Sequence, residues 1–158
     1  MIKSKVYLFF ILFVAYVSFS CNKENDVIPD VYVDFYIDIN DARYVTKLSS
    51  IGGSIIVNQY TTNDPDAAGY AGSGIIIAAG TDNEFYAYDR TCPNEYSIDG
   101  SVVQVNIDQT LFAKAVCPEC QSAYELLSFG TPASGISKYP LKNYSADFDG
   151  RFIHVWNK

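Results

Sequence analysis

The chain has 158 residues, and its 18 acidic and 11 basic residues give it a net charge of −7. This acidic balance, with no cluster of lysine or arginine, argues against nucleic-acid partners. Thirteen tyrosines, together with many Val and Ile residues, make a composition typical of a folded β protein.

The first 20 residues have the features of an export signal. Lys3 and Lys5 precede an apolar run at residues 6–17, which is too short for a comfortable membrane span. Small residues follow, and Ser20 stands directly before Cys21. The segment resembles the lipobox of bacterial lipoproteins, although Phe19 is larger than that pattern prefers. The alternative is an ordinary secretory signal with a chance cysteine.

The lipobox resemblance implies a signal peptide at residues 1–20, a lipidated Cys21, and a polar tether over residues 21–29. Acyl chains on Cys21 would anchor the protein to a membrane. We expect a cell-envelope location, as an outer-membrane lipoprotein facing the periplasm or the cell surface. Cleavage would remove two of the 11 basic residues and none of the 18 acidic ones, which lowers the net charge from −7 to −9.

Residues 30–158 are expected to form one domain built of strands. Residues 31–39 alternate apolar and polar side chains, as in a strand with one buried face. Asp149-Gly150 is typical of a tight hairpin turn between the last two strands, and residues 108–110 are expected to turn a second hairpin. No convincing helical periodicity is present, so the predicted class is all-β, a sandwich or small barrel. Strands are expected at residues 31–39, 54–60, 74–79, 84–89, 101–107, 111–116, 123–127, 144–148 and 151–156.

Two short cysteine segments are the most informative part of the sequence. The first reads Cys92-Pro93-Asn94-Glu95 and the second Cys117-Pro118-Glu119-Cys120. Their spacing resembles that of the Rieske iron–sulfur family, in which Cys-x-His and Cys-x-x-His loops hold a 2Fe–2S cluster. The resemblance implies that both loops lie at the tips of neighbouring hairpins and meet in space.

The resemblance extends over about residues 85–156. Residues 121–126 (QSAYEL) stand where the family usually has Gly-Ser-x-Phe-Asp, and residues 129–135 (FGTPASG) resemble its Gly-x-Pro-x-x-Gly turn. Pro140-Leu141 and Tyr144 follow at a similar spacing. The family therefore implies a Rieske-like β fold for the second half of the chain.

The ligand positions depart from the family. Asn94 stands at the first histidine position, and Cys120 stands at the second. The only histidine, His154, lies in the last predicted strand and is interpreted as an ordinary strand residue. An ordinary cluster with two cysteines and two histidines therefore cannot form from these loops.

Three uses of the remaining thiols stay open. A disulfide could join Cys92 to Cys120 or to Cys117, or could close a small ring between Cys117 and Cys120. A zinc or other single-metal site could use Cys92, Glu95, Cys117 and Cys120, whose spacing is close to that of a zinc knuckle. The third possibility is an iron–sulfur cluster with three cysteines and one oxygen ligand from Glu95 or Asn94.

Two main functional hypotheses follow. The first is a lipid-anchored extracytoplasmic module that has lost the normal cluster, carries no cofactor, and serves a structural or binding role. The alternative is an electron-transfer or metal-binding protein that holds iron–sulfur or zinc. Enzymatic activity is not expected, because the cysteines have no general base nearby other than carboxylates. The tyrosines leave open a surface for glycans or for a protein partner, which the sequence does not identify.

Overall fold

The computed structural model describes residues 27–157. The predicted signal peptide and Cys21 lie outside these residues, as does the tether before Val27. The ten strands of the described part are β1 (Asp34–Asp38), β2 (Ser54–Val57), β3 (Ile75–Ala79), β4 (Phe85–Asp89), β5 (Asn106–Ile107), β6 (Lys114–Val116), β7 (Ala123–Glu125), β8 (Thr131–Ser134), β9 (Asn143–Phe148) and β10 (Phe152–Trp156).

Short helical segments connect some of these strands. They are the α-helices α2 (Val45–Leu48), α3 (Gln59–Thr62) and α4 (Pro93–Asp99) and the 3₁₀ turns η1 (Pro65–Ala67) and η2 (Tyr70–Gly72). Within residues 27–157, no helix has the length and apolar content that a membrane span requires.

The larger sheet has six antiparallel strands in the order β1-β10-β9-β4-β3-β2. Alternation in β1 buries Phe35 and Ile37 against the first core, whereas Tyr36 faces solvent. β3 is buried along its whole length, as its continuous apolar sequence predicts. Its odd-numbered residues enter the first core, and Ile76 and Ala78 enter a second core on the opposite face.

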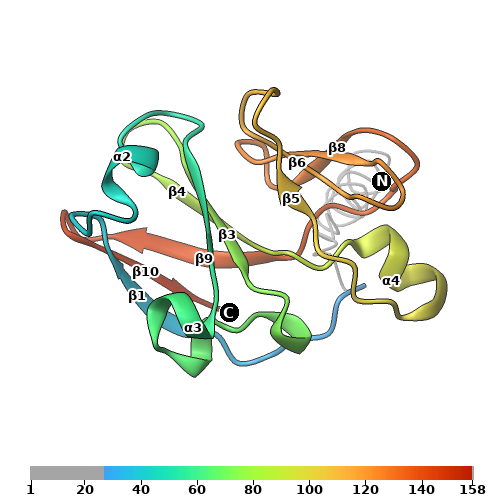
Figure 1. Ribbon diagram of the computed structural model, residues 1–158, viewed down its shortest axis with the longest axis horizontal. Coiled ribbons are helices and arrows are strands. Elements are labelled where there is room, and N and C mark those ends of the chain that lie inside the picture. Colours follow the sequence, from blue (N-terminus) through green and yellow to red (C-terminus); the bar gives the residue numbers. More distant parts are fainter. Residues whose placement is uncertain (1–26, 158) are drawn as a thin grey trace, which may run out of the picture.

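The smaller sheet has four antiparallel strands in the order β5-β6-β7-β8. It lies at the end of the molecule that also carries α4 (Figure 1). The second core contains Tyr124 and Leu126 from this part of the chain, Tyr88 from β4, and the cysteines Cys92 and Cys117. The cysteine segments are therefore built into the second core rather than placed on its surface.

Both predicted hairpins are confirmed. β9 and β10 pair across the Asp149-Gly150 turn, where Gly150 has φ +101° and the Asp149 carboxylate accepts the amides of Arg151 and Phe152. β5 and β6 pair as the second hairpin, although β5 has only two residues.

The absence of helices is the main expectation that was wrong. α4 begins directly after Cys92, with Pro93 in its first turn, and ends at Gly100, whose φ is +80°. Pro at the first helical position and Gly after the last are the usual boundaries of a helix. A helix of seven residues has only two turns, which is too short to show an apolar period in the sequence.

The predicted strand at residues 54–60 is also shorter than expected. β2 ends at Val57, and the Asn58 side chain accepts the amides of Tyr60 and Thr61 to begin α3. Asparagine favours this N-cap position because its side-chain oxygen replaces a missing main-chain acceptor.

Candidate metal centre

The first cysteine segment lies where β4 leads into α4. Cys92 is the N-cap residue of α4 and is fully buried. Because residues three apart lie on the same face of a helix, the first turn of α4 places Glu95 on the same face as Cys92. This position differs from the expected hairpin tip, because a helix, not a second strand, follows Cys92.

The second segment forms the tip of the β6–β7 hairpin, as expected. The Gln121 amide donates to the Cys117 carbonyl at 3.1 Å, and the Cys117 amide donates to the Ser122 carbonyl at 3.0 Å. Gln121 has φ +57°, which lets the turn close within a few residues. Each segment thus has the form Cys-Pro-x-ligand, with the fourth residue returned toward the first.

The two segments converge on one point. The Sγ atoms of Cys92, Cys117 and Cys120 and a carboxylate oxygen of Glu95 all lie within 4.8 Å of one another. The Sγ atoms of Cys92 and Cys120 are 3.7 Å apart. In a tetrahedral zinc site with Zn–S bonds of about 2.3 Å, two sulfurs are about 3.8 Å apart. The four atoms therefore have the spacing of ligands around a single ion.

Burial keeps two of these thiols protonated when no cation is bound. Burial raises the pKa of Cys117 to about 12, even though the main-chain amides of Cys120 and Glu119 donate to its sulfur. Burial also raises the pKa of Cys92, against the opposing effect of hydrogen bonds from the Tyr124 hydroxyl and the Glu95 amide. A cation would reverse this preference, because a coordinated thiol loses its proton.

Two residues that support the centre were not assigned a role from the sequence. The Tyr124 hydroxyl lies 3.4 Å from the Cys92 sulfur. The Ser122 hydroxyl accepts the amides of Ile136 at 3.1 Å and Ser137 at 3.0 Å, which fastens the β8–β9 connection beside the cysteine loop. Both residues belong to the Ser-Ala-Tyr segment that carries the family resemblance. That resemblance was the sequence signal that could have identified them.

Asn94, which stands at the first histidine position of the family pattern, is buried next to Glu95. Its side-chain amide donates to the Glu95 carboxylate at 3.1 Å. It therefore orients the carboxylate that lies beside the three sulfurs. His154 is a strand residue as interpreted, with its Nε2 atom 2.7 Å from the Asp34 carboxylate and its ring stacked on Tyr36.

None of the three possible disulfides is formed among the described residues. Cys92, Cys117 and Cys120 are free cysteines in the described part of the chain. The 3.7 Å between the sulfurs of Cys92 and Cys120 is far longer than the roughly 2.05 Å of a disulfide bond. The loops meet as expected, but without a covalent link.

The donor set does not fit the usual Rieske cluster. That cluster needs two thiolates on one iron and two imidazoles on the other, and the described residues supply no imidazole here. The two thiolates and the two imidazoles would also have to lie on opposite sides of the two-iron core. Four ligand atoms within 4.8 Å of one another are instead grouped around one position.

No protein-family model matches the sequence, and no curated protein matches it. Among solved structures, the ferredoxin of carbazole 1,9a-dioxygenase from Nocardioides aromaticivorans IC177 has 16% identity and a TM-score of 0.45, over 71% of this chain and 93% of that one. A complex of reduced oxygenase and oxidized ferredoxin in carbazole 1,9a-dioxygenase has 17% identity and a TM-score of 0.47, over 80% of this chain and 94% of that one. Sequence identities and TM-scores this low do not support an inference about function.

The fold class follows from the arrangement of the chain itself. The molecule is all-β in its framework, with a four-stranded sheet whose β6–β7 hairpin brings Cys117 and Cys120 to Cys92. The two cysteine loops therefore meet in space, as the sequence resemblance implied.

Proposed function

We propose that this protein is an extracytoplasmic metal-binding domain that holds one zinc ion through Cys92, Glu95, Cys117 and Cys120. The observation that carries the proposal is the grouping of these four ligand atoms within 4.8 Å. Three thiolates make a soft donor set, which favours zinc or iron over calcium or magnesium.

The role we propose for the ion is structural. The protein supplies four ligands, so no coordination position is left open for a substrate, as a hydrolytic zinc site requires. The ion would join the β4–α4 junction to the β6–β7 hairpin, adding to the hydrogen-bond contact between the Tyr124 hydroxyl and the Cys92 sulfur. The domain would then serve as a rigid binding module at the cell envelope, anchored through Cys21.

Metal analysis of the full-length protein, extracted in detergent, tests this proposal. We expect one zinc ion per chain in the wild type and a loss of bound zinc in Cys117→Ser and Cys120→Ser. Cys21→Ser is the matched control, because it removes a thiol outside the site and should retain zinc. Zinc content unchanged by the loss of either site cysteine would contradict the proposal.

The same control tests the anchor. If Cys21 is lipidated, wild-type protein enters the detergent phase of a Triton X-114 partition, and Cys21→Ser protein stays in the aqueous phase. Equal partition of the two proteins would contradict the lipid anchor without affecting the metal proposal.

The second candidate function is electron transfer by iron in the same ligands. Its support is that Cys120 and Glu95 are only partly buried, so an ion here would lie close to the surface. A coloured sample with stoichiometric iron and reversible bleaching on reduction would favour this function. Acid-labile sulfide in that sample would show a cluster and would overturn the single-ion proposal.

A further inference from the structure

The three cysteines of the candidate metal centre differ in their access to solvent. Cys92 and Cys117 are fully buried, whereas Cys120, at the tip of the β6–β7 hairpin, is only partly buried. A dissolved reagent therefore reaches the Cys120 sulfur more readily than the other two. Because the reaction of a thiol with an external disulfide depends on this access, we expect oxidation of the centre to begin at Cys120.

A second sulfur is in place to complete the oxidation. The Sγ atoms of Cys92 and Cys120 are 3.7 Å apart, although 28 residues separate them in the sequence. A disulfide bond of about 2.05 Å requires the two sulfurs to approach by roughly 1.7 Å. Cys120 lies in a turn, whereas Cys92 begins α4 and belongs to the second core. A small shift of the hairpin tip would therefore close the distance while Cys92 keeps its place.

Cys117 is less suited to pair with Cys120. The main-chain amides of Glu119 and Cys120 both donate to the Cys117 sulfur, which holds that sulfur inside its own turn. A disulfide between Cys117 and Cys120 would change the turn itself, because these donors surround the sulfur that has to move. Pairing with Cys92 changes only the position of the hairpin tip.

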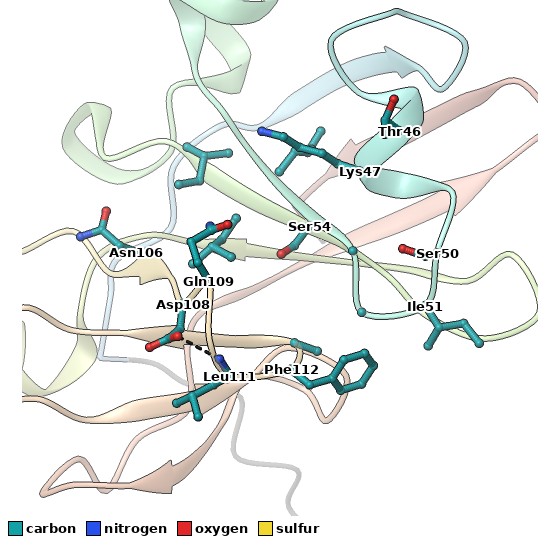
Figure 2. A pocket seen from close by; sticks show the side chains of 16 residues that line it. Thr46, Lys47, Ser50, Ile51, Ser54, Asn106, Asp108, Gln109, Leu111 and Phe112 are labelled. Atoms are coloured by element: carbon teal, nitrogen blue, oxygen red, sulfur yellow. Dashed lines mark hydrogen bonds between the residues drawn. The ribbon is translucent and has the colours of Figure 1, made fainter.

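No sulfur atom outside the centre competes in the part of the chain that the structure describes. The fourth cysteine is Cys21 and the single methionine is Met1, and both precede the described residues. The cleft between the two sheets, which Figure 2 shows with Lys47 and Ser54 on one side and Phe112 on the other, has no cysteine among its lining residues. Thiol oxidation of the folded domain therefore reports on the cysteine centre alone.

We propose that the centre is a thiol–disulfide switch, in which loss of zinc lets Cys92 and Cys120 form a disulfide that closes the site to metal. This inference rests on the zinc binding proposed above and adds its regulation. Disulfides persist outside the cytoplasm, where the domain is proposed to lie. The β4–α4 junction stays joined to the β6–β7 hairpin in both states, by the ion or by the disulfide. Oxidation removes two of the four ligands, because the thiolate is the form that binds metal.

The oxidant is a small-molecule disulfide, RSSR. The Cys120 sulfur attacks one sulfur of RSSR, which breaks the S–S bond, forms a mixed disulfide on Cys120 and releases one RSH that carries the Cys120 proton. The Cys92 sulfur then attacks the Cys120 sulfur, which breaks the mixed disulfide and releases a second RSH that carries the Cys92 proton. Two protein thiols are oxidised and one external disulfide is reduced, so no other reactant is needed.

Peptide mapping after controlled oxidation tests the switch. Full-length protein in detergent, either zinc-loaded or zinc-depleted, is incubated with oxidised glutathione and quenched with iodoacetamide. Mass spectrometry of the non-reduced peptides then gives the state of each cysteine. In the depleted protein we expect a Cys92–Cys120 disulfide and a free Cys117. Bound zinc should slow the oxidation at least about tenfold, since a coordinated sulfur is no longer a free nucleophile.

Matched variants separate the two steps. Cys92→Ser should stop at the mixed disulfide between Cys120 and glutathione, because the second attacking sulfur is missing. Cys117→Ser, which also removes a proposed zinc ligand, should still form the Cys92–Cys120 disulfide. The wild-type map needs no substitution, so it decides the pairing even where a variant fails to fold. Oxidised wild type should lose zinc binding, and dithiothreitol should restore it.

Three outcomes would overturn the switch. They are a main product that links Cys117 to either of the other two cysteines, a mixed disulfide on Cys120 that never resolves in the wild type, and an oxidised protein that still binds one zinc ion. If the reduced protein binds zinc but oxidises equally fast with and without it, the switch fails and the metal proposal stands. If the reduced protein binds no zinc, both fail.

Discussion

At the scale of single residues, the chemistry of the cysteine site depends on Glu95. It stands in the position that Cys120 occupies in the other Cys-Pro-x-ligand segment, and Asn94 donates to its carboxylate. A carboxylate binds zinc but is harder than a thiolate. Glu95 should therefore contribute to zinc affinity as a harder donor than the three thiols beside it.

Removing the carboxylate should weaken zinc binding. We expect Glu95→Ala to raise the Kd for Zn²⁺ at least about 100-fold, since even residues that only orient ligands contribute about 10–100-fold. Competition with a chromophoric chelator measures this. Glu119→Ala is the control, because Glu119 is exposed within the second segment and does not belong to the four-ligand group. An equal effect of both substitutions would show that only the overall negative charge matters.

At the scale of elements, the cysteine hairpin is held in place by its neighbours. Gly135 on the β8–β9 connection lies so close to Ser122 that an added Cβ would come within 2.4 Å of the Ser122 Cα. The Ser122 hydroxyl then accepts two amides of the same connection. These contacts position the hairpin whether or not a metal is bound.

Ser122→Ala should destabilise the fold. The Ile136 and Ser137 amides would lose their acceptor, which costs about 1–3 kcal/mol when the groups stay out of water. Urea unfolding of the metal-free protein measures the change in the free energy of unfolding. Ser128→Ala, an exposed serine of the same region, should change it by less than about 0.5 kcal/mol. No difference between the two variants would contradict this role for Ser122.

At the scale of the whole molecule, the two cores depend differently on the cysteines. The second core contains Cys92 and Cys117, whereas the first core contains no cysteine and includes residues of β1 and β10. β3 contributes to both cores and connects them. Loss of the metal should therefore loosen one end of the molecule first.

Removal of zinc by a chelator should have a local effect. We expect amide hydrogen exchange to accelerate about tenfold or more in α4 and in the β6–β7 hairpin, and to change little in β1 and β10. Mass-spectrometric exchange before and after chelation, with zinc added back as a control, measures this. A uniform change over all strands would show that the ion stabilises the whole fold equally.

Alkaline pH should destabilise the molecule through buried tyrosines. Burial raises the pKa of Tyr144, and the nearby Asp89 carboxylate, which accepts its hydroxyl at 2.8 Å, raises it further. Above the unfolded pKa of about 10, the unfolded chain loses this proton first. The contribution of the Tyr144 hydroxyl to the free energy of unfolding is thus complete below that pH. It is lost as the pH rises toward the pKa of Tyr144 in the folded protein.

Tyr144→Phe should lower the free energy of unfolding at pH 8 by about 1.5–3 kcal/mol, because the hydroxyl donates to a buried carboxylate. The difference from wild type should shrink by pH 10.5, as measured by urea unfolding at both pH values. Tyr60→Phe is the control, since Tyr60 is 80% exposed and should show no effect. A difference that stays constant with pH would contradict the proposed proton linkage.

Much of this architecture could be predicted from the sequence. The alternation of residues 31–39, the apolar run of β3 and the Asp149-Gly150 turn act over a few neighbouring residues, so they identify strands and a hairpin directly. The two cysteine segments are local as well, so the sequence indicates their residues as candidate metal ligands or disulfide partners.

The tertiary structure decided what those residues do together. Cys92 and Cys120 are 28 residues apart, and only the packing of the β6–β7 hairpin against β4 brings their sulfurs to 3.7 Å. No local propensity distinguishes this grouping from a disulfide or from separated thiols, because it depends on long-range strand pairing and a shared core. The short helix α4 was missed for a local reason, because two helical turns are too few to show an apolar period in the sequence.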